Sequence, residues 1–422
     1  MNETANPTAS HLRTSDLRGA GRLAMHALLG LTDLVENLHH NIVRARGPLG
    51  TASNGPAAGI TGLVYRSIRG TTRLVGGSLD ALLGQVLALV GTSEVLPSPE
   101  REAVLAALNG VLGDHLEATA NPLAIEMQIR HDGKPLDLES GSLALPQARR
   151  RVLLLAHGLC MSPAQWRRHG RDTGAALAAE GGFTLLHLHY NSGLHISSNG
   201  RLLGDRLRKL QAAWPVPIEE LVIIGHSMGG LVARSAWELG RARGDAWPGR
   251  VTKMIFLGTP HHGAPLERGG HWIDVILGAS PYTAAFARLG KMRSAGITDL
   301  RHGSLLDSDW AGSDRFAHGH DTRTHVPLPA GVACYAVAGS LGSEPGELRE
   351  KLLGDGIVPV ASALGRHKRA SRSLGFEPGR QWIGQGLNHL DLLDAEAVLA
   401  KLRQWLSEPG ISGTRVLRIS AR

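Results

Sequence analysis

The chain has 422 residues, roughly two to three times the length of a typical single domain, so it can bury a large core. Hydrophobic residues make up 42% and charged residues 19%, a globular balance that excludes global disorder. Aromatic residues make up only 4%, and the formal charge of +8 is spread along the chain, so we expect no nucleic-acid partner. Two cysteines cannot form a disulfide framework.

The first 118 residues have the pattern of helices. Apolar residues recur at helical period from Leu17 to Ile42 and again from Ile60 to Val90. A third helix is predicted to begin at Ser98 and Pro99, an N-cap followed by a first-turn proline. We therefore predict a helical N-terminal region over residues 1–118.

Within this region, residues 40–90 combine basic charge with glycine. Five arginines and no acid lie between Glu36 and Asp80, and Arg66, Arg69 and Arg73 have helical spacing. A basic amphipathic helix of this kind lies on an anionic bilayer. The glycines instead favour a helical subdomain packed on the rest of the chain, because each costs an isolated helix about 1 kcal/mol. A cap, a packing unit and a membrane-apposed segment therefore all stay open.

Because the first residues are polar and apolar runs are short, we expect neither a secretory leader nor a membrane-spanning helix. We expect a cytoplasmic protein, with peripheral membrane contact as the addition that residues 40–90 suggest.

From about residue 119 the pattern changes to short apolar runs that alternate with helical patterns. His131 to Lys134 reads as a hairpin turn. Four near-continuous apolar stretches have strand length: Val152–Ala156, Leu221–Ile224, Met254–Leu257 and Val332–Ala338. Such runs are typical of strands buried on both faces, so we predict an α/β domain with a mainly parallel sheet over residues 119–409. Residues 410–422 form a short basic tail.

A Gly-x-Ser-x-Gly motif directly follows the second of these runs. Ser227 stands between Gly225 and Gly229, and a helical pattern starts at once. A nucleophile elbow needs this strand–turn–helix context, since the turn leaves no room for side chains two residues before and after the serine. We predict that Ser227 is a nucleophile.

Two backbone N–H groups are expected to form an oxyanion hole. One belongs to Met228, directly after Ser227, and the other to Leu159, which follows the first strand of the predicted parallel sheet. In α/β enzymes of this kind an acid and a histidine follow the serine in the chain. Asp355 lies between glycines after an apolar strand, and His389 lies in a loop before the closing helix. We predict that His389 is the general base and that Asp355 orients it.

Other histidines and one cysteine are weaker candidates. His157 is expected to brace the oxyanion loop, and His226 is too close to Ser227 in the turn to serve it. His261 and His262 follow a strand and are expected to pack as polar residues, with site lining or metal binding as the alternatives. Cys160 has no histidine placed to activate it.

Together, these motifs resemble those of the α/β-hydrolase fold lipases and esterases. The resemblance is greatest to bacterial triacylglycerol lipases and to the PGAP-like serine esterases, and it covers residues 121–408. It implies an α/β-hydrolase fold, with the helical N-terminal region as an addition. In bacterial lipases an Asp two residues after the catalytic His helps to bind calcium, and Asp391 matches that position. No second ligand stands out among the acids of residues 307–321, so we expect no required cofactor, with calcium as the alternative.

We therefore predict a serine carboxylester hydrolase that acts on lipidic or acyl esters through an acyl-enzyme. The same residues serve thioesterases and acyltransferases, because an oxyanion hole does not specify the leaving group. A membrane- or granule-associated interaction protein is the alternative of a different class.

Overall fold

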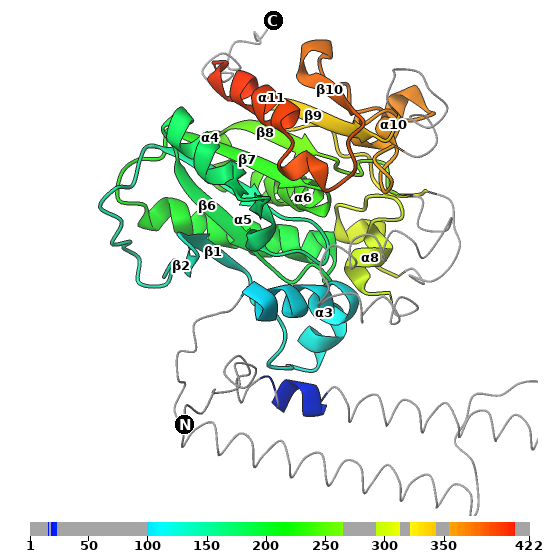
Figure 1. The fold of residues 1–422 in the computed structure, drawn as a ribbon. Coiled ribbons are helices and arrows are strands. Elements are labelled where there is room, and N and C mark those ends of the chain that lie inside the picture. The colour runs from blue at the N-terminus through cyan, green and yellow to red at the C-terminus, as the bar shows by residue number, and fades with distance from the viewer. Residues whose placement is uncertain are drawn as a thin grey trace, which may run out of the picture. The chain divides into compact units, whose positions relative to one another are not determined.

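The computed structural model describes residues 16, 18–22, 99–264, 293–312, 321–342 and 354–409 (Figure 1). It divides the chain into two compact units, Met1–Arg101 with Leu116–Ala124, and Glu102–His115 with Ile125–Arg422. Within the first unit, Arg101 Nε donates to Asp16 over 2.7 Å, and Asn121 Nδ2 donates to the carbonyl of Gly19.

Three sequence predictions concern segments that these ranges leave out or do not decide. Residues 40–90 and the tail 410–422 lie outside the described residues. The boundary between residues 118 and 119 stays a prediction, although the third predicted helix is present as α3, Pro99–Ala118.

An eight-stranded sheet forms the centre of the second unit. Its order is β10-β9-β8-β7-β3-β6-β1-β2. The neighbours from β10 to β6 are parallel, and β1 and β2 join the edge antiparallel. The strands are β1 (Gln128–His131), β2 (Lys134–Pro135), β3 (Arg151–Ala156), β6 (Thr184–His189), β7 (Glu220–His226), β8 (Val251–Leu257), β9 (Ala333–Ser340) and β10 (Gln381–Gln385). A separate hairpin pairs β4 (Arg167–Arg168) with β5 (Arg171–Asp172).

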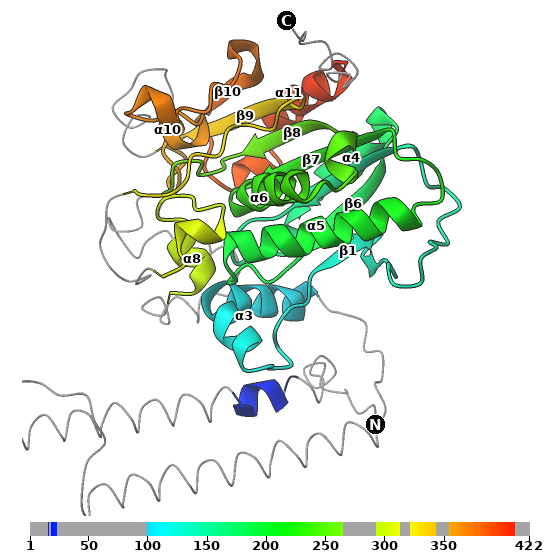
Figure 2. The same ribbon diagram turned by 180° about the vertical axis from the view of Figure 1, so that it is seen from behind.

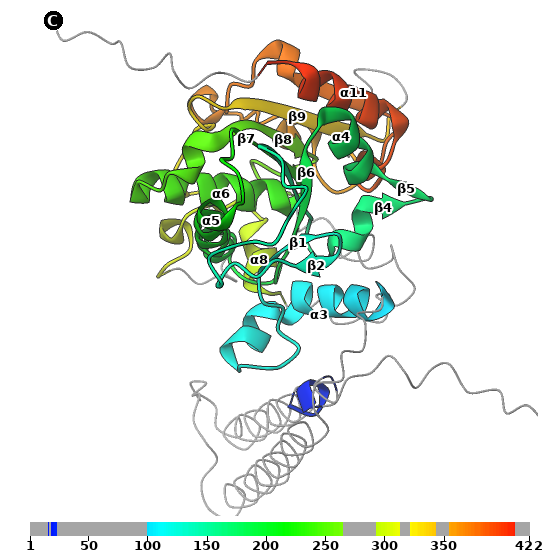
Figure 3. The same cartoon turned by 90° about the vertical axis from the view of Figure 1, so that its left-hand side faces the viewer.

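Helices cover both faces of this sheet. In Figures 2 and 3, α4 (Thr173–Gly181) and α11 (Glu396–Ser407) lie on one face, whereas α5 (Ile196–Ala213) and α6 (Met228–Arg243) lie on the other. Two short helices, α8 (Ala295–Asp299) and α10 (Val360–Ala363), lie in the connections. Single 3-10 turns occupy Pro163–Trp166, Trp247–Arg250, Asp307–Asp309, Ala370–Arg372, Pro378–Arg380 and Asp391–Leu393.

The core explains why the central strands are apolar almost without interruption. In β3, Leu153 and Leu155 belong to a buried cluster that joins the sheet to α4 and α11 through Leu177 and Leu402. Leu154, also fully buried, points to the other face, since side chains alternate along a strand. The predicted mainly parallel α/β sheet is confirmed, as is the hairpin, in which His131 pairs with Lys134.

Among the described residues, no helix has both the length and the apolar character needed to cross a bilayer.

Candidate active site

Ser227 lies in a tight turn between β7 and α6, in a backbone conformation that few non-glycine residues adopt. Its φ is 53° and its ψ is −124°. A Cβ on Gly225 would lie 2.5 Å from the Cα of Gly230, and a Cβ on Gly229 would lie 2.6 Å from the carbonyl oxygen of His157. Side chains at these two glycines would force the turn open. This is the strand–turn–helix geometry of a nucleophile elbow, and it places Ser227 at the carboxyl end of β7.

Asp355 and His389 form a buried pair at the same edge of the sheet. His389 Nδ1 lies 2.7 Å from Asp355 Oδ2, and each residue is 2% exposed. The other carboxylate oxygen accepts the N–H groups of Ile357 and Val358 over 3.0 and 2.8 Å. Because the ionised carboxylate can only accept, it fixes the His389 proton on Nδ1 and leaves the lone pair on Nε2. His389 Nε2 is buried and has no hydrogen-bond partner in the part of the chain that the structure describes.

Two further contacts bring the His389 loop against the elbow. His226 Nε2 donates to the carbonyl oxygen of His389 over 3.0 Å, and the two imidazole rings have centroids 4.6 Å apart. Gly258, directly after β8, leaves space for the imidazole, since a Cβ there would lie 3.0 Å from the His389 ring. Gly339 in β9 likewise makes room for Asp355, 2.8 Å from where its Cβ would be. The structure thus brings the loops that carry Ser227, Asp355 and His389 together.

The two predicted oxyanion donors also reach this edge. Met228 is the first residue of α6, where an N–H has no partner within the helix. Leu159 follows β3, the neighbour of β7, and is buried with Met228. A Cβ on Gly158 would lie 3.0 Å from the Cβ of Ser227, so the Leu159 turn and the elbow are in close contact. Both N–H groups therefore belong to backbone that adjoins Ser227.

Comparison with known proteins gives a family match for part of the chain. Residues 147–328 match the family model described as the PGAP1-like alpha/beta domain. The chain has the α/β-hydrolase fold. The match includes Leu159, Ser227 and Met228, whereas Asp355 and His389 follow it in the chain. The predicted resemblance to α/β-hydrolase lipases and esterases is confirmed at this level.

Among solved structures, the chain is similar to a lipase from Bacillus licheniformis in its mature form. The identity is 19% and the TM-score 0.41, over 67% of this chain and 98% of that one. Aspergillus fumigatus lipase B has 12% identity and a TM-score of 0.39, over 67% and 59% of the two chains. The RedJ thioesterase of Streptomyces coelicolor has 12% identity and a TM-score of 0.34, over 66% and 98%. No curated protein matches the sequence significantly.

Three other histidines near this edge of the sheet, His157, His226 and His261, are buried and pack as neutral residues. His157 donates from Nδ1 to the carbonyl of Gly158 over 2.9 Å and stacks on Tyr190. Burial lowers the pKa of His157 to about 3 and lowers that of His226 well below its usual value. His261 is buried, and its Nδ1 lies 3.2 Å from a guanidinium nitrogen of Arg234. An arginine can only donate, so this nitrogen of His261 is unprotonated.

Asp391, the calcium ligand that the resemblance implied, has a partner in its own loop. Asp391 Oδ2 accepts the N–H of Asn388 over 2.9 Å, which ties down the turn that carries His389. Asp307 pairs with Arg201, and Asp321 lies within ion-pair distance of Arg323. The described ranges contain no group of three or more acidic, histidine or cysteine residues that could hold a metal ion. Calcium binding and the absence of a required cofactor stay predictions.

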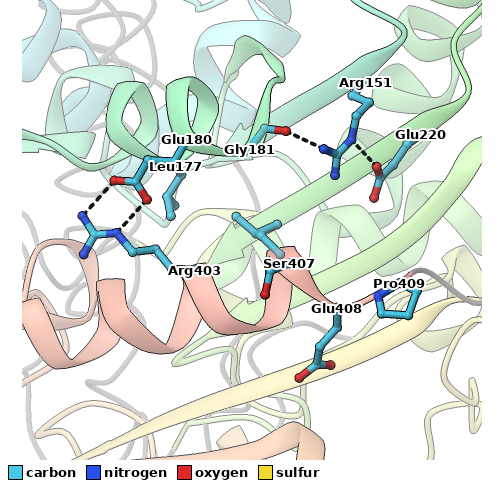
Figure 4. A pocket seen from close by; sticks show the side chains of 10 residues that line it. Arg151, Leu177, Glu180, Gly181, Glu220, Arg403, Ser407, Glu408 and Pro409 are labelled. Carbon is cyan, nitrogen blue, oxygen red and sulfur yellow. Dashed lines mark hydrogen bonds and ion pairs between the residues drawn. The ribbon is translucent and has the colours of Figure 1, made fainter.

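A cavity of about 490 Å³ lies away from this edge (Figure 4). Arg151 and Glu220, which form an ion pair in its wall, are the first residues of β3 and β7. Ser227 follows the last residue of β7, so the strand separates the two places by about 20 Å. The cavity is therefore no part of the candidate active site.

Sequence reasoning missed several residues that shape the site. Tyr190 donates its hydroxyl to the carbonyl of His157 over 2.8 Å and so supports the turn before Leu159. Gly258 and Gly339 stand at the ends of predicted strands, where a glycine signals close approach of another group. That signal was available in the sequence, but the identity of the approaching side chain was not.

Proposed function

We propose that this protein is a serine carboxylester hydrolase in which Ser227, His389 and Asp355 form a catalytic triad. The observation that carries the proposal is the buried Asp355–His389 pair, with the unpartnered Nε2 of His389 beside the elbow that holds Ser227. This tautomer is the one that a general base needs. Ser227 Oγ makes no hydrogen bond to His389 Nε2 in the described structure, and such contacts commonly tighten when substrate binds.

In the first half of the reaction, the hydroxyl oxygen of Ser227 attacks the ester carbonyl carbon while His389 Nε2 accepts the hydroxyl proton. Negative charge develops on the carbonyl oxygen, which accepts hydrogen bonds from the N–H groups of Leu159 and Met228. Each such donor lowers the barrier by about 3 kcal/mol. The amino end of α6 adds the positive end of a helix dipole at the same place.

The tetrahedral intermediate then collapses, and the carbon–oxygen bond to the leaving group breaks. His389 returns the proton to the departing alkoxide, so an alcohol leaves and the acyl group stays on Ser227. In the second half, His389 deprotonates a water molecule that attacks the acyl-enzyme, and the carboxylic acid is released. Asp355 remains ionised throughout and stabilises the imidazolium form of His389.

Lipidic or acyl esters are the proposed substrates. This part of the proposal is supported by the motifs that resemble those of lipases and esterases, together with the PGAP1-like match over residues 147–328. The proposed oxyanion donors and triad treat esters and thioesters alike, so thioesters are included among the candidate substrates.

Labelling with a fluorophosphonate tests the proposal directly. We expect the folded protein to be labelled once, at Ser227 as located by peptide mass spectrometry, and the heat-denatured protein to be unlabelled. A panel of esters and thioesters with graded acyl chains then defines the substrate. Absence of label on a folded sample that also turns over none of the panel contradicts the proposal.

Contact of residues 40–90 with a membrane is a separate proposal that rests on their basic helical pattern alone. Flotation with anionic vesicles compares the full chain with a variant in which Arg66, Arg69 and Arg73 are changed to glutamine. Wild-type binding that persists at physiological salt and is lost in the variant supports membrane contact through these arginines. Equal recovery of both proteins supports a packed helical cap instead.

A further inference from the structure

The turn after β3 has a second unusual backbone conformation, at Cys160. Its φ is 57°, in the left-handed region that favours glycine, although Cys160 carries a side chain. The N–H of Cys160 donates to Ser192 Oγ over 3.0 Å. Cys160 is buried, and burial raises the pKa of its thiol to about 12, so the group is a neutral packing residue. Cys160 follows Leu159 directly, so its placement restrains the Leu159 backbone, whose N–H lies in the preceding peptide unit.

Helix α3 packs closely against this turn at Gly110. A Cβ on Gly110 would overlap Cys160 Sγ and would lie 2.9 Å from both the Cα and the backbone nitrogen of Cys160. Only a residue without a side chain lets the helix backbone come this near. Cys160 is therefore held by two contacts: its side chain and backbone pack against Gly110 of α3, and its N–H donates to Ser192 Oγ.

Hydrogen bonds to other segments fix α3 around Gly110. Ser294 Oγ donates to the carbonyl of Gly110 over 2.6 Å, and Asn191 Nδ2 donates to the carbonyl of Gly113 over 2.9 Å. Asp114 Oδ2 accepts the N–H of Ala295 over 3.0 Å. Residues from two distant segments thus hold α3 in place. A side chain added at Gly110 would therefore displace Cys160 and not the helix.

We propose that Gly110 and Ser192 are positioning residues that set the direction of the Leu159 N–H in the oxyanion hole, acting through Cys160. This inference rests on the proposed function. An oxyanion donor acts only when it is held close to its productive geometry, and a displacement of about 1 Å can cost about 10²-fold in rate. Neither residue touches the reacting atoms, so the effect is expected in turnover more than in ground-state binding.

Gly110→Ala is the first test, measured on a soluble short-chain ester. We expect kcat to fall between about tenfold and 10²-fold, with KM changed by less than about threefold. The affinity for an alkyl boronic acid, which forms a tetrahedral adduct with a serine, is expected to fall in parallel with kcat. Gly240→Ala is the matched control, because a Cβ there would lie 2.7 Å from the Trp247 ring, at the end of α6 remote from Met228. Thermal melting of both variants reports the purely structural cost.

Rescue by Cys160→Gly separates positioning from packing. Removing Sγ relieves the closest contact of the new methyl group and leaves those with the backbone of residue 160, and glycine adopts the left-handed conformation freely. We expect the cost of Gly110→Ala in kcat to shrink by about threefold in the Cys160→Gly background, while the cost of Gly240→Ala is unchanged. An equal cost of Gly110→Ala in both backgrounds overturns the proposal.

Ser192→Ala decides the question if Gly110→Ala does not fold. It removes the acceptor of the Cys160 N–H and adds no atoms, and it is expected to lower kcat with KM nearly unchanged. A kcat within about twofold of wild type overturns the positioning role. A wild-type protein that turns over no ester and takes no fluorophosphonate label overturns the proposed function itself, which is a separate result.

Discussion

His226 donates a hydrogen bond from Nε2 to the backbone carbonyl of His389, 3.0 Å away. The residue that precedes the strained Ser227 therefore holds the loop that carries the imidazole. Burial and the neighbouring His389 both lower the pKa of His226 well below its usual value, so its ring stays neutral and the donor stays in place across neutral pH. The turn that holds Ser227 and the loop that holds His389 are thus connected by a hydrogen bond between the His226 ring and the His389 backbone.

Substitution of His226 by alanine is expected to loosen this connection. Because the His389 loop loses its tie to the elbow, we expect kcat to fall by about tenfold to 10²-fold, while fluorophosphonate labelling of Ser227 slows but persists. Steady-state kinetics and the rate of labelling check the two expectations. A His226→Ala protein with wild-type kcat shows that the bond has no part in positioning His389.

Replacing Ser227 by alanine removes the nucleophilic oxygen and leaves the neighbouring glycines unchanged. Turnover of the best ester in the panel is expected to fall by about 10³-fold or more. Circular dichroism of the purified variant is expected to match the wild type. Turnover above about a tenth of the wild-type rate places the nucleophile elsewhere.

Asp355→Asn and Asp391→Asn are expected to differ sharply. The first replaces the carboxylate that faces His389 Nδ1 and favours the wrong tautomer, for which we expect a fall in kcat of about 10⁴-fold. The second alters only the acceptor of the Asn388 N–H, so its effect is expected on thermal stability. Single-turnover kinetics compare the two variants, and a larger loss for Asp391→Asn identifies a different acid.

Buried histidines make the stability of the α/β unit depend on pH. Burial lowers the pKa of His189 to about 3 and that of His187 to about 4. The unfolded chain binds these protons below its ordinary histidine pKa of about 6.5, whereas the folded chain does not, so stability is lost as the pH falls from about 6.5 toward 4. Each residue accounts for about 1.4 kcal/mol between pH 7.5 and 5.5.

The variant His189→Gln tests this sign and size. Urea unfolding followed by tryptophan fluorescence is expected to show that the loss between pH 7.5 and 5.5 shrinks by about 1.4 kcal/mol relative to wild type. The exposed His325 provides the matched control, and His325→Gln is expected to change the loss much less. An unchanged pH dependence in His189→Gln means that His189 binds its proton equally in both states.

The sequence predicted the central sheet because four of its strands are buried on both faces and are therefore apolar throughout. Strand β6 escaped notice since it carries His187 and His189, whose burial depends on neighbours that lie far away in the chain. The turn around Ser227 is a local motif, so the sequence shows it directly. That Asp355 faces His389 could be inferred only from the expected chain order, and its distance needed the structure.

The support of the Leu159 turn could not be predicted from the sequence. Gly110 belongs to a helix that its periodicity placed in the predicted N-terminal region. Nothing in the sequence around Gly110 indicates that Cys160 is its neighbour. The α/β unit includes Glu102–His115, so this helix packs with elements that follow it by fifty to two hundred positions. Contacts of that kind depend on tertiary packing, which periodicity along one helix does not encode.

The distance in the chain between Ser227 and His389 has a consequence for folding during synthesis. Ser227 follows β7, whereas His389 follows β10, the edge strand that the ribosome releases last among those of the sheet. Domains form their long-range contacts late, since each requires a long loop to close. A nascent chain that has completed β7 and α6 exposes a serine without a base. On the proposed function, hydrolytic competence is acquired only when β9 and β10 dock, which delays the reactive state until the fold that controls it is complete.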